Sequence, residues 1–471
     1  MPALPPTATL LMVYAVGAVL AGLMYVALSV ATRASTSPRA MAVRRPGWIA
    51  RRRARRGIVH PPREGWVVGY SSAIRTVRLT ARELGLGGLL FGAPGSGKTM
   101  AIRGAIQAAA ASSMGAVIID PKRSPELRQL VWALGGRVWT ISGAEVWNPF
   151  EADPEVMAEQ LLEGEPEDRA APRVFREGAR LAARQLGRAL AQAGEPPDVH
   201  RVAQLLRSGE WEALAQERLG PRYAPLTDHE RDGVQTFAAG LTGLLLGPAG
   251  RSLGSGRGSW RLQEVLARGQ LVLFSLDSKY PDTSRRIAGW VFLSLLAQLS
   301  DRQDRPGRPC LVAVDEAHRL GWTGRLAVDL LATGRQAGVP VILSSQGPSD
   351  LDELGRHLLE RAAQDAAWIL AFRQGTLDSD RAARLLGVHQ VEERTWSQGR
   401  QHDWETVRLV EKPRVPASAL EALQPGDGQL WVPGVDGRPP RTEHVRVAQP
   451  VPIGPGPKPL PALPAPPPAA A

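Results

Sequence analysis

Residues 92–99 read GAPGSGKT, which matches the phosphate-binding spacing G-x-x-x-x-G-K-[ST]. Glycines let such a loop turn its backbone N–H groups towards phosphate oxygens, and a following helix adds its positive N-terminus. We expect Lys98 to reach the β- and γ-phosphates of ATP and Thr99 to hold Mg²⁺. The predicted nucleotide-binding residues are the whole loop: Gly92, Ala93, Pro94, Gly95, Ser96, Gly97, Lys98 and Thr99.

An apolar run followed by two acids supplies the partner that a phosphate loop needs. Leu311–Val314 ends in Asp315 and Glu316. We predict that Asp315 lies on the Mg²⁺ side and that Glu316 is the base that orients and activates a water for attack on the γ-phosphate. Acids also follow strands on ordinary protein surfaces, but the phosphate loop elsewhere in the chain favours the functional interpretation.

A third apolar run, Val339–Leu343, is followed by two serines and Gln346. An amide at the end of a strand beside the phosphate loop can hydrogen-bond the γ-phosphate or the attacking water, so we predict that Gln346 is a sensor. The alternative is a cluster of turn or helix-cap residues.

Two arginines are candidates for an arginine finger that reaches the nucleotide of a neighbouring subunit. Arg335 lies in a predicted Gly-flanked loop just before the third apolar run. Arg373 follows the strand-like run Trp368–Phe372 and is the competing candidate. A plain surface arginine is the alternative interpretation of Arg335.

The elements that must position these residues are apolar runs that are continuous rather than alternating, which is typical of strands buried on both faces of a parallel sheet. They are Val67–Tyr70, Gly88–Phe91, Ala116–Ile119, Arg137–Ile141, Leu271–Leu276, Leu311–Val314, Val339–Leu343 and Trp368–Phe372. Residues 152–268 show helical spacing, and we expect an all-helical insert there. Shorter β-like runs follow at Val407–Val410 and Gln429–Val432. The predicted fold class is α/β with a parallel-rich central sheet.

The N-terminal region has the composition of a membrane anchor. Leu10–Ala31 contains 22 residues without a charge, and such a helix, about 33 Å long, crosses a bilayer core. Nine arginines and no acid lie between residues 33 and 56. The positive-inside rule therefore places the N-terminus outside the cell membrane and the rest of the chain in the cytoplasm. A buried core helix is the alternative.

These features divide the chain into six predicted segments. They are a single-pass anchor (1–32), a basic juxtamembrane linker (33–63), a first part of the sheet domain (64–151), the helical insert (152–268), a second part of the sheet domain (269–449) and a Pro-rich extended tail (450–471).

Composition narrows the range of partners. Lys and Arg total 57 against 46 Asp and Glu, a net charge of +11 that favours a polyanionic partner, either nucleic acid or an anionic membrane. Nine of the arginines lie between residues 33 and 56 of the linker, so the surplus is weaker support for DNA than the total suggests. One cysteine, Cys310, excludes a disulfide framework and a cysteine-built zinc site.

Four segments together resemble one family: GAPGSGKT, the triplet 120–122 (DPK), residues 147–150 (WNPF), and VDEAH with the later GRQAGVPVILSSQ. They are similar to the TraG/TraD-type coupling proteins of conjugation and type IV secretion, within the FtsK/HerA group of P-loop ATPases. The order of parts also matches: an N-terminal anchor, a RecA-like domain and an all-helical insert. The resemblance covers about residues 64–435.

The resemblance implies a membrane-anchored ATPase, usually a hexameric ring, that delivers single-stranded DNA with its relaxase to a type IV secretion channel. It also implies nucleotide and Mg²⁺ binding at Lys98 and Thr99, a Walker B pair at Asp315 and Glu316, and a sensor at Gln346. The sequence departs from the family in having one predicted membrane span where many members have two, and in residues 123–126, which read RSPE.

Other functions fit parts of the pattern. A DNA segregation pump of the FtsK type generally ends in a small winged-helix DNA reader, whereas this chain ends in a Pro-rich stretch. A membrane adaptor that recruits protein substrates, with nucleotide as a structural ligand only, does not need the complete set Lys98, Glu316 and Gln346. Small-molecule kinases with a phosphate loop have no use for an anchor and a long helical insert.

Overall fold

The computed structural model describes residues 65–71, 75–150, 153–163, 173–256, 258–304, 307–398, 403–434 and 439–450. The predicted anchor, the predicted linker and the predicted tail beyond Pro450 lie outside these ranges. Within the described ranges, no helix is long and apolar enough to span a bilayer.

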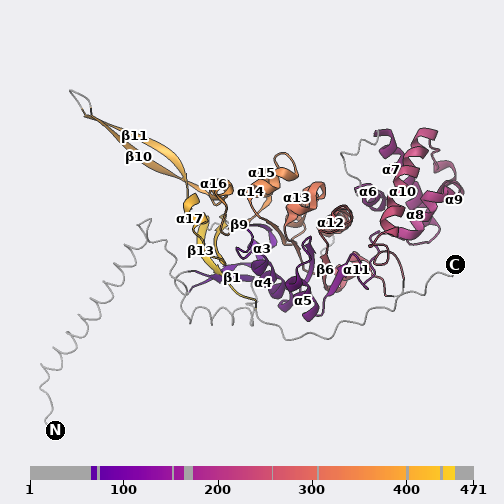
Figure 1. Cartoon of the computed structure of the whole chain (residues 1–471), viewed down its shortest axis with the longest axis horizontal. Coiled ribbons are helices and arrows are strands. Elements are labelled where there is room, and N and C mark those ends of the chain that lie inside the picture. Colours follow the sequence, from indigo (N-terminus) through magenta and orange to yellow (C-terminus); the bar gives the residue numbers. More distant parts are fainter. Residues whose placement is uncertain are drawn as a thin grey trace, which may run out of the picture. The chain divides into compact units, whose positions relative to one another are not determined.

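The centre of the described chain is an eleven-stranded sheet (Figure 1). Its strands are β1 (Trp66–Tyr70), β2 (Thr76–Leu79), β3 (Gly88–Phe91), β4 (Gly115–Asp120), β5 (Arg137–Thr140), β6 (Leu271–Ser275), β7 (Cys310–Val314), β8 (Val341–Ser345), β9 (Trp368–Ala371), β12 (Asp427–Val432) and β13 (Arg441–Val447). Their order is β2-β1-β13-β12-β9-β3-β8-β7-β4-β6-β5. All pairings from β9 to β5 are parallel, whereas those from β2 to β9 are antiparallel. The predicted α/β class with a largely parallel sheet is confirmed.

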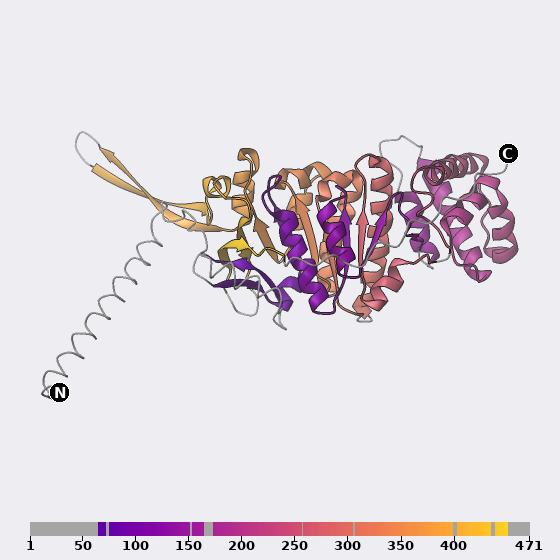
Figure 2. The same cartoon turned by 60° about the horizontal axis from the view of Figure 1, so that its bottom comes forward.

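Helices cover both faces of the parallel strands (Figure 2). One face carries α4 (Lys98–Ala111) and α5 (Pro125–Ala133), and the other carries α11 (Leu262–Arg268), α12 (Pro281–Asp304), α13 (Gly324–Gln336), α14 (Pro348–Leu354) and α15 (Leu358–Asp365). Shorter helices are α3 (Ala81–Gly85), η3 (Ala317–Thr323), α16 (Thr376–Leu385) and α17 (Ala417–Glu421).

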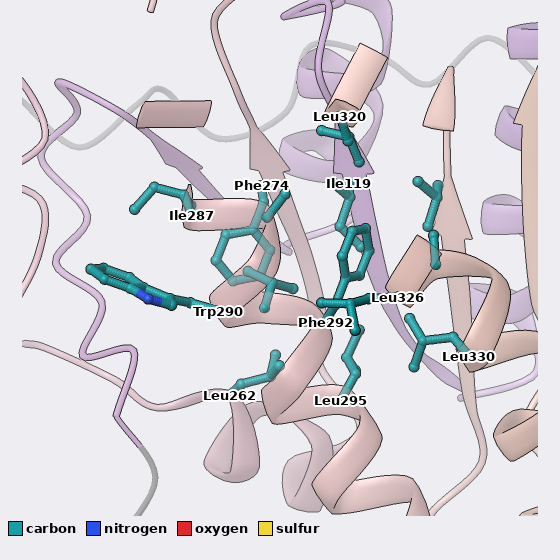
Figure 3. Close-up of a cluster of buried hydrophobic side chains, with 14 of the residues drawn as sticks. Ile119, Leu262, Phe274, Ile287, Trp290, Phe292, Leu295, Leu320, Leu326 and Leu330 are labelled. Atoms are coloured by element: carbon teal, nitrogen blue, oxygen red, sulfur yellow. The ribbon is translucent and has the colours of Figure 1, made fainter. Parts of the chain in front are cut away.

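Neighbouring residues of one strand enter different hydrophobic cores, which explains why the apolar runs are continuous. Ile118 packs with Ile102 of α4, whereas Ile119 packs in the core on the opposite face. Figure 3 shows that second core, where Ile119 and Phe274 of the sheet lie near Phe292 of α12. Strands with both faces buried have no polar alternation.

The predicted strand Val339–Leu343 is wrong in its bounds, because β8 runs from Val341 to Ser345. Pro340 has no N–H to donate to a sheet ladder, although its carbonyl accepts a hydrogen bond from Val312 N at 2.9 Å. The strand therefore starts after the proline and includes both serines. Gln346 directly follows its last residue.

Helices dominate the stretch expected to be helical. They are α6 (Pro154–Glu163), α7 (Arg173–Gln192), α8 (Val199–Ser208), α9 (Glu210–Leu219), η2 (Gly220–Arg222) and α10 (Asp228–Leu246), which contact one another. A capping box begins α10, with Thr227 Oγ1 accepting from Glu230 N. At the end of the stretch, α11 contacts β4 and α12 and so packs with the sheet.

The chain leaves and rejoins the sheet through one aromatic cluster. Trp147 is fully buried, and its ring lies 4.8 Å from that of Phe274 and 5.8 Å from that of Trp139. The backbone N–H of Trp147 donates to Ser252 O at 2.9 Å, so the outgoing and returning segments lie side by side. The WNPF segment thus forms the connection between the sheet and the helices α6–α10.

A buried amide joins the same helices to α12. Gln160 of α6 is fully buried, and its Nε2 donates to Ser294 Oγ at 2.7 Å and to Pro149 O at 2.8 Å. Removing such an amide leaves buried acceptors without partners, which costs more than the bonds themselves contribute. The contact therefore ties α6 to α12, which packs on the sheet.

A separate hairpin consists of β10 (Val388–Gln398) and β11 (Asp403–Pro413), paired antiparallel in unbroken register (Figure 1). Sequence analysis identified only Val407–Val410 of it. Charged residues interrupt both strands, and Val407 and Leu409 are 53% and 65% exposed. Without a buried face, the hairpin has no apolar periodicity that a sequence pattern can reveal.

We predict that Trp147→Ala lowers the free energy of unfolding by about 3–5 kcal/mol, because it leaves a cavity among three aromatic rings. Urea unfolding followed by circular dichroism measures the change. Leu377→Ala is the control, since Leu377 is 93% exposed and surface substitutions usually change stability by less than about 0.5 kcal/mol. Equal effects of the two substitutions would contradict the role given to this cluster.

Candidate functional site

The predicted site residues converge at one edge of the sheet because β3, β8, β7 and β4 are neighbouring parallel strands. The carboxyl ends of parallel strands meet at the same edge, where ligands bind in open α/β sheets. The phosphate loop follows β3, Asp315 and Glu316 follow β7, and Gln346 follows β8. The DPK triplet begins at Asp120, the last residue of β4, at the same edge.

Backbone hydrogen bonds hold the first part of the phosphate loop. Gly92 N donates to Gln346 O at 2.9 Å, and Ala93 N donates to Arg373 O at 2.8 Å. Ser96 O accepts from Gly426 N at 2.7 Å, so the turn before β12 closes over the loop. The N–H groups of Gly92 and Ala93 are therefore used within the protein, and phosphate contacts are left to the part of the loop nearer α4.

Lys98 is the first residue of α4 and its side chain is 5% exposed. Its ammonium group donates to Gly92 O, lies 3.5 Å from Ala93 O, and forms an ion pair with Glu316 Oε1 at 3.4 Å. Burial lowers the pKa of Lys98, and the charge of Glu316 opposes this shift.

Asp315 is positioned to help hold a divalent cation beside the loop. Thr99 Oγ1 donates to Asp315 Oδ2 at 3.1 Å, while the buried Oδ1 makes no hydrogen bond to any residue in the described ranges. Burial, followed by the charge of Glu316, raises the pKa of Asp315. A hydroxyl and a carboxylate with a buried unpaired oxygen fit Mg²⁺, which is bound by oxygen ligands and favours the ionised acid.

Glu316 accepts contacts at both carboxylate oxygens. Oε1 lies 2.5 Å from Lys122 Nζ and 3.4 Å from Lys98 Nζ. Oε2 accepts from Gln346 Nε2 at 3.0 Å, and His318 Nε2 lies 3.4 Å away. Burial raises the pKa of Glu316, but the hydrogen bond from Lys122 and the charge of Lys98 outweigh it and hold the pKa at about 2.

The backbone of Glu316 is also unusual. Its φ is +49°, in the left-handed region that residues other than glycine and asparagine seldom adopt. Such a conformation costs about 1–3 kcal/mol and persists only where its surroundings enforce it. Here the ion pairs compensate it, and they aim the carboxylate along the edge towards the phosphate loop.

Gln346 links the acid to the phosphate loop. Its side chain donates to Glu316, its carbonyl accepts from Gly92 N, and its own N–H donates to Asp350 Oδ2 at 2.8 Å. Asp350 also accepts from Ser345 Oγ at 2.9 Å. The side-chain amide thus lies against the acid while the backbone of the same residue holds the phosphate loop, and the sensor role stays a prediction.

Two residues of the DPK triplet were not identified as site residues from the sequence. Lys122 contacts Glu316, and the fully buried Asp120 accepts from Lys122 N at 2.9 Å and Ser124 N at 2.5 Å. Burial raises the pKa of Asp120 to about 6. The signal available in the sequence was an acid and a lysine at the end of an apolar run. Its meaning depends on the sheet, where β4 adjoins β7 and so brings Lys122 to Glu316.

The two candidate arginines lie at different edges. The prediction that Arg335 occupies a loop is wrong: it is an exposed residue in the last turn of α13, next to the amino end of β8. It is therefore not brought together with the other site residues of its own chain. Arg373 is exposed two residues after the end of β9, and its carbonyl accepts a hydrogen bond from Ala93 N of the phosphate loop.

Solved structures of coupling proteins and a related protein share this fold. Unbound TrwBdeltaN70, a bacterial conjugative coupling protein, matches with a TM-score of 0.61 and 15% identity over 85% of this chain and 93% of that one. The plasmid coupling protein TrwB in complex with ADP and Mg²⁺ matches with 0.61 and 17% over 86% and 93%. VirB4 of Thermoanaerobacter pseudethanolicus matches with 0.51 and 14% over 82% and 96%.

No family model matches the sequence, and no curated protein matches it significantly. At sequence identities of 14–17%, these structural similarities show a common fold and nothing more. The chemistry of this chain therefore has to be argued from its own residues.

We predict that Gly97→Ala destabilises the phosphate loop more than Gly95→Ala. Both glycines have positive φ, +124° and +72°, but a Cβ at Gly97 would lie 3.1 Å from Gly426 Cα and 3.1 Å from a Phe372 ring atom, while one at Gly95 meets nothing within 4 Å. Left-handed strain alone costs about 1–2 kcal/mol, and the contacts at Gly97 add about 1–3 kcal/mol. Measuring the free energy of unfolding of both variants tests this. If both variants lose the same free energy, the loop accommodates the added Cβ at Gly97 and the prediction is wrong.

Proposed function

We propose that this chain is an ATPase whose single site lies at the carboxyl edge of the sheet. The observation that carries this proposal is the pairing of Thr99 with Asp315 at 3.1 Å, beside a buried Lys98–Glu316 pair. One edge of the sheet thus holds the lysine and the hydroxyl of the phosphate loop together with the two acids that follow β7. These pairs of residues come from two distant parts of the sequence. This is the arrangement that phosphoryl transfer requires.

Each residue has a role in this proposal. Lys98 and the N–H groups of the loop near α4 bind the β- and γ-phosphates. Thr99 and Asp315 hold Mg²⁺, which neutralises charge on the phosphates when it is bound. Glu316 orients a water and takes its proton, and Gln346 holds that water or the γ-phosphate in place.

We further propose that ATP hydrolysis drives DNA transport. The support is the fold shared with the conjugative coupling protein TrwB and with VirB4, together with the surplus of basic residues. In this proposal the chain delivers single-stranded DNA with its relaxase to a type IV secretion channel.

The proposed assembly is a homo-hexamer at the inner membrane with the ATPase on the cytoplasmic side. Residues 10–31 would be the single-pass anchor, residues 33–63 the linker, residues 64–151 and 269–449 the motor, residues 152–268 the helical insert and residues 450–471 an extended tail. The uncharged N-terminal stretch and the arginines that follow it are the support for the anchor.

The full chain should hydrolyse ATP, and DNA should stimulate it. Glu316→Gln should keep ATP bound but reduce turnover by about 10²-fold or more, because an amide cannot accept the proton of the water. Turnover and fluorescent-nucleotide binding, each measured with and without single- and double-stranded DNA, test this.

Lys98→Ala is the matched variant, since it removes the phosphate contact and should abolish nucleotide binding itself. Normal turnover by Glu316→Gln would remove this residue from the mechanism. Turnover that no DNA changes would argue against the transport motor while leaving the ATPase intact.

We propose that Arg335 acts in trans, with Arg373 as the alternative. An Arg335→Ala subunit should bind ATP normally, because its own phosphate loop is intact. Mixed with Lys98→Ala subunits, it should recover part of the lost turnover, since some junctions then pair an intact Lys98 site with an intact Arg335.

Recovery requires that the two variants exchange subunits, which fluorescence energy transfer between labelled variants can verify. A mixture as inactive as both parents, with exchange verified, would exclude Arg335 as a trans residue. The same mixture made with Arg373→Ala then tests the arginine at the carboxyl edge.

A further inference from the structure

Lys122 makes the shortest contact that Glu316 receives from a cation. Its Nζ lies 2.5 Å from Oε1, whereas Lys98 Nζ lies 3.4 Å from the same atom. The Lys122 side chain is 32% exposed and that of Glu316 is 2% exposed. The ion pair therefore joins a surface residue to the acid that the proposed reaction depends on.

The loop that carries Lys122 is built to hold one shape. Asp120 is fully buried and accepts hydrogen bonds from the N–H groups of Lys122 and Ser124. Arg123 has a φ of +58°, and its guanidinium pairs with Asp277, in the loop after β6, at 2.7 Å. A loop with a buried acidic anchor and a strained residue directs the Lys122 side chain back over Glu316.

The Glu316 carboxylate is crowded in this arrangement, because its side chain is only 2% exposed and both of its oxygens have protein neighbours. Oε1 is shared by two ammonium groups, and Oε2 is contacted by a side-chain amide, an imidazole and, at 3.7 Å, a guanidinium. A general base must reach the proton it takes, directly or through one water. Among the described residues, the charged or titratable groups that face Glu316 are Lys98 of α4, Lys122 of the loop after β4, His318 and Arg319 of η3, and Asp315 of its own strand end.

Bound nucleotide is expected to compete for only one of these partners. Lys98 belongs to the phosphate loop, where phosphates would attract its ammonium group, whereas Lys122 lies outside that loop and contacts Glu316 Oε1 independently of it. The resting ion pair therefore survives nucleotide binding unless Lys122 moves as well.

We propose that Lys122 is a latch that holds Glu316 away from water, and that this ion pair must open before ATP is hydrolysed. The inference rests on the proposed ATPase function. Lys122 acts through Glu316, so it is a positioning residue rather than a catalytic one.

The test is the steady-state turnover of the full-length chain without DNA. Lys122→Met should raise kcat by about two- to fivefold, the size expected from removing a partly exposed ion pair on the reacting group. KM for ATP and the affinity for ADP should stay within about twofold, because Lys122 does not hold the phosphates. Lys122→Arg should restore the low wild-type kcat, because it restores the charge.

The matched control is Lys279→Met. Lys279 is an exposed lysine of the neighbouring loop that stacks on Tyr280 and is not in contact with Glu316. It should leave kcat unchanged. If Lys122→Met does not fold, Lys122→Gln also removes the charge and keeps a polar end on the side chain.

Each outcome decides the proposal. A higher kcat in Lys122→Met, at unchanged KM and with rescue by arginine, supports the latch. An unchanged or lower kcat in a wild-type protein that hydrolyses ATP overturns the latch and leaves the proposed ATPase standing. A wild-type chain that hydrolyses no ATP under any condition overturns the proposed function and the latch together.

Discussion

The candidate site depends on two opposite charges that are buried side by side. Lys98 and Glu316 are 5% and 2% exposed, and their charged groups lie 3.4 Å apart. A single ionised group in such surroundings shifts its pKa until it is neutral. Because each charge offsets the cost of burying the other, Lys98 stays positive and can bind phosphate, and Glu316 stays negative and can accept a proton from water.

That compensation is possible because the sheet places β3 and β7 on either side of β8. The three strands end at the same level, so the phosphate loop, the two acids and Gln346 come within hydrogen-bond distance. The bond from Gly92 N to Gln346 O locks the loop to the end of β8. A shift in the register of either strand would separate the pair and leave a buried charge without a partner.

The helices outside the sheet reach the same edge through α12. Gln160 of α6 bonds to Ser294 near the middle of α12, and Ser284 near its start accepts from and donates to the backbone of Asp277. Asp277 in turn pairs with Arg123, the residue after Lys122. The aromatic cluster around Trp147 supports this junction from the sheet side. The helical insert is therefore connected to the Lys122 loop through α12 and the loop residue Asp277.

Local sequence patterns determined the parts of this protein whose chemistry is local. The phosphate loop and the acids at 315 and 316 could be identified because fixed spacing and an apolar run specify them without reference to the fold. The parallel strands could be identified because burial on both faces removes polar residues. Pairing across the sheet was decided only by the tertiary structure, since Lys122 meets Glu316 through strand order, which no spacing encodes. The hairpin β10–β11 and the helical position of Arg335 also depended on packing. An unburied strand has no apolar period, and Gly334, which is buried against the core, does not break α13, which ends at Gln336 just before Gly338.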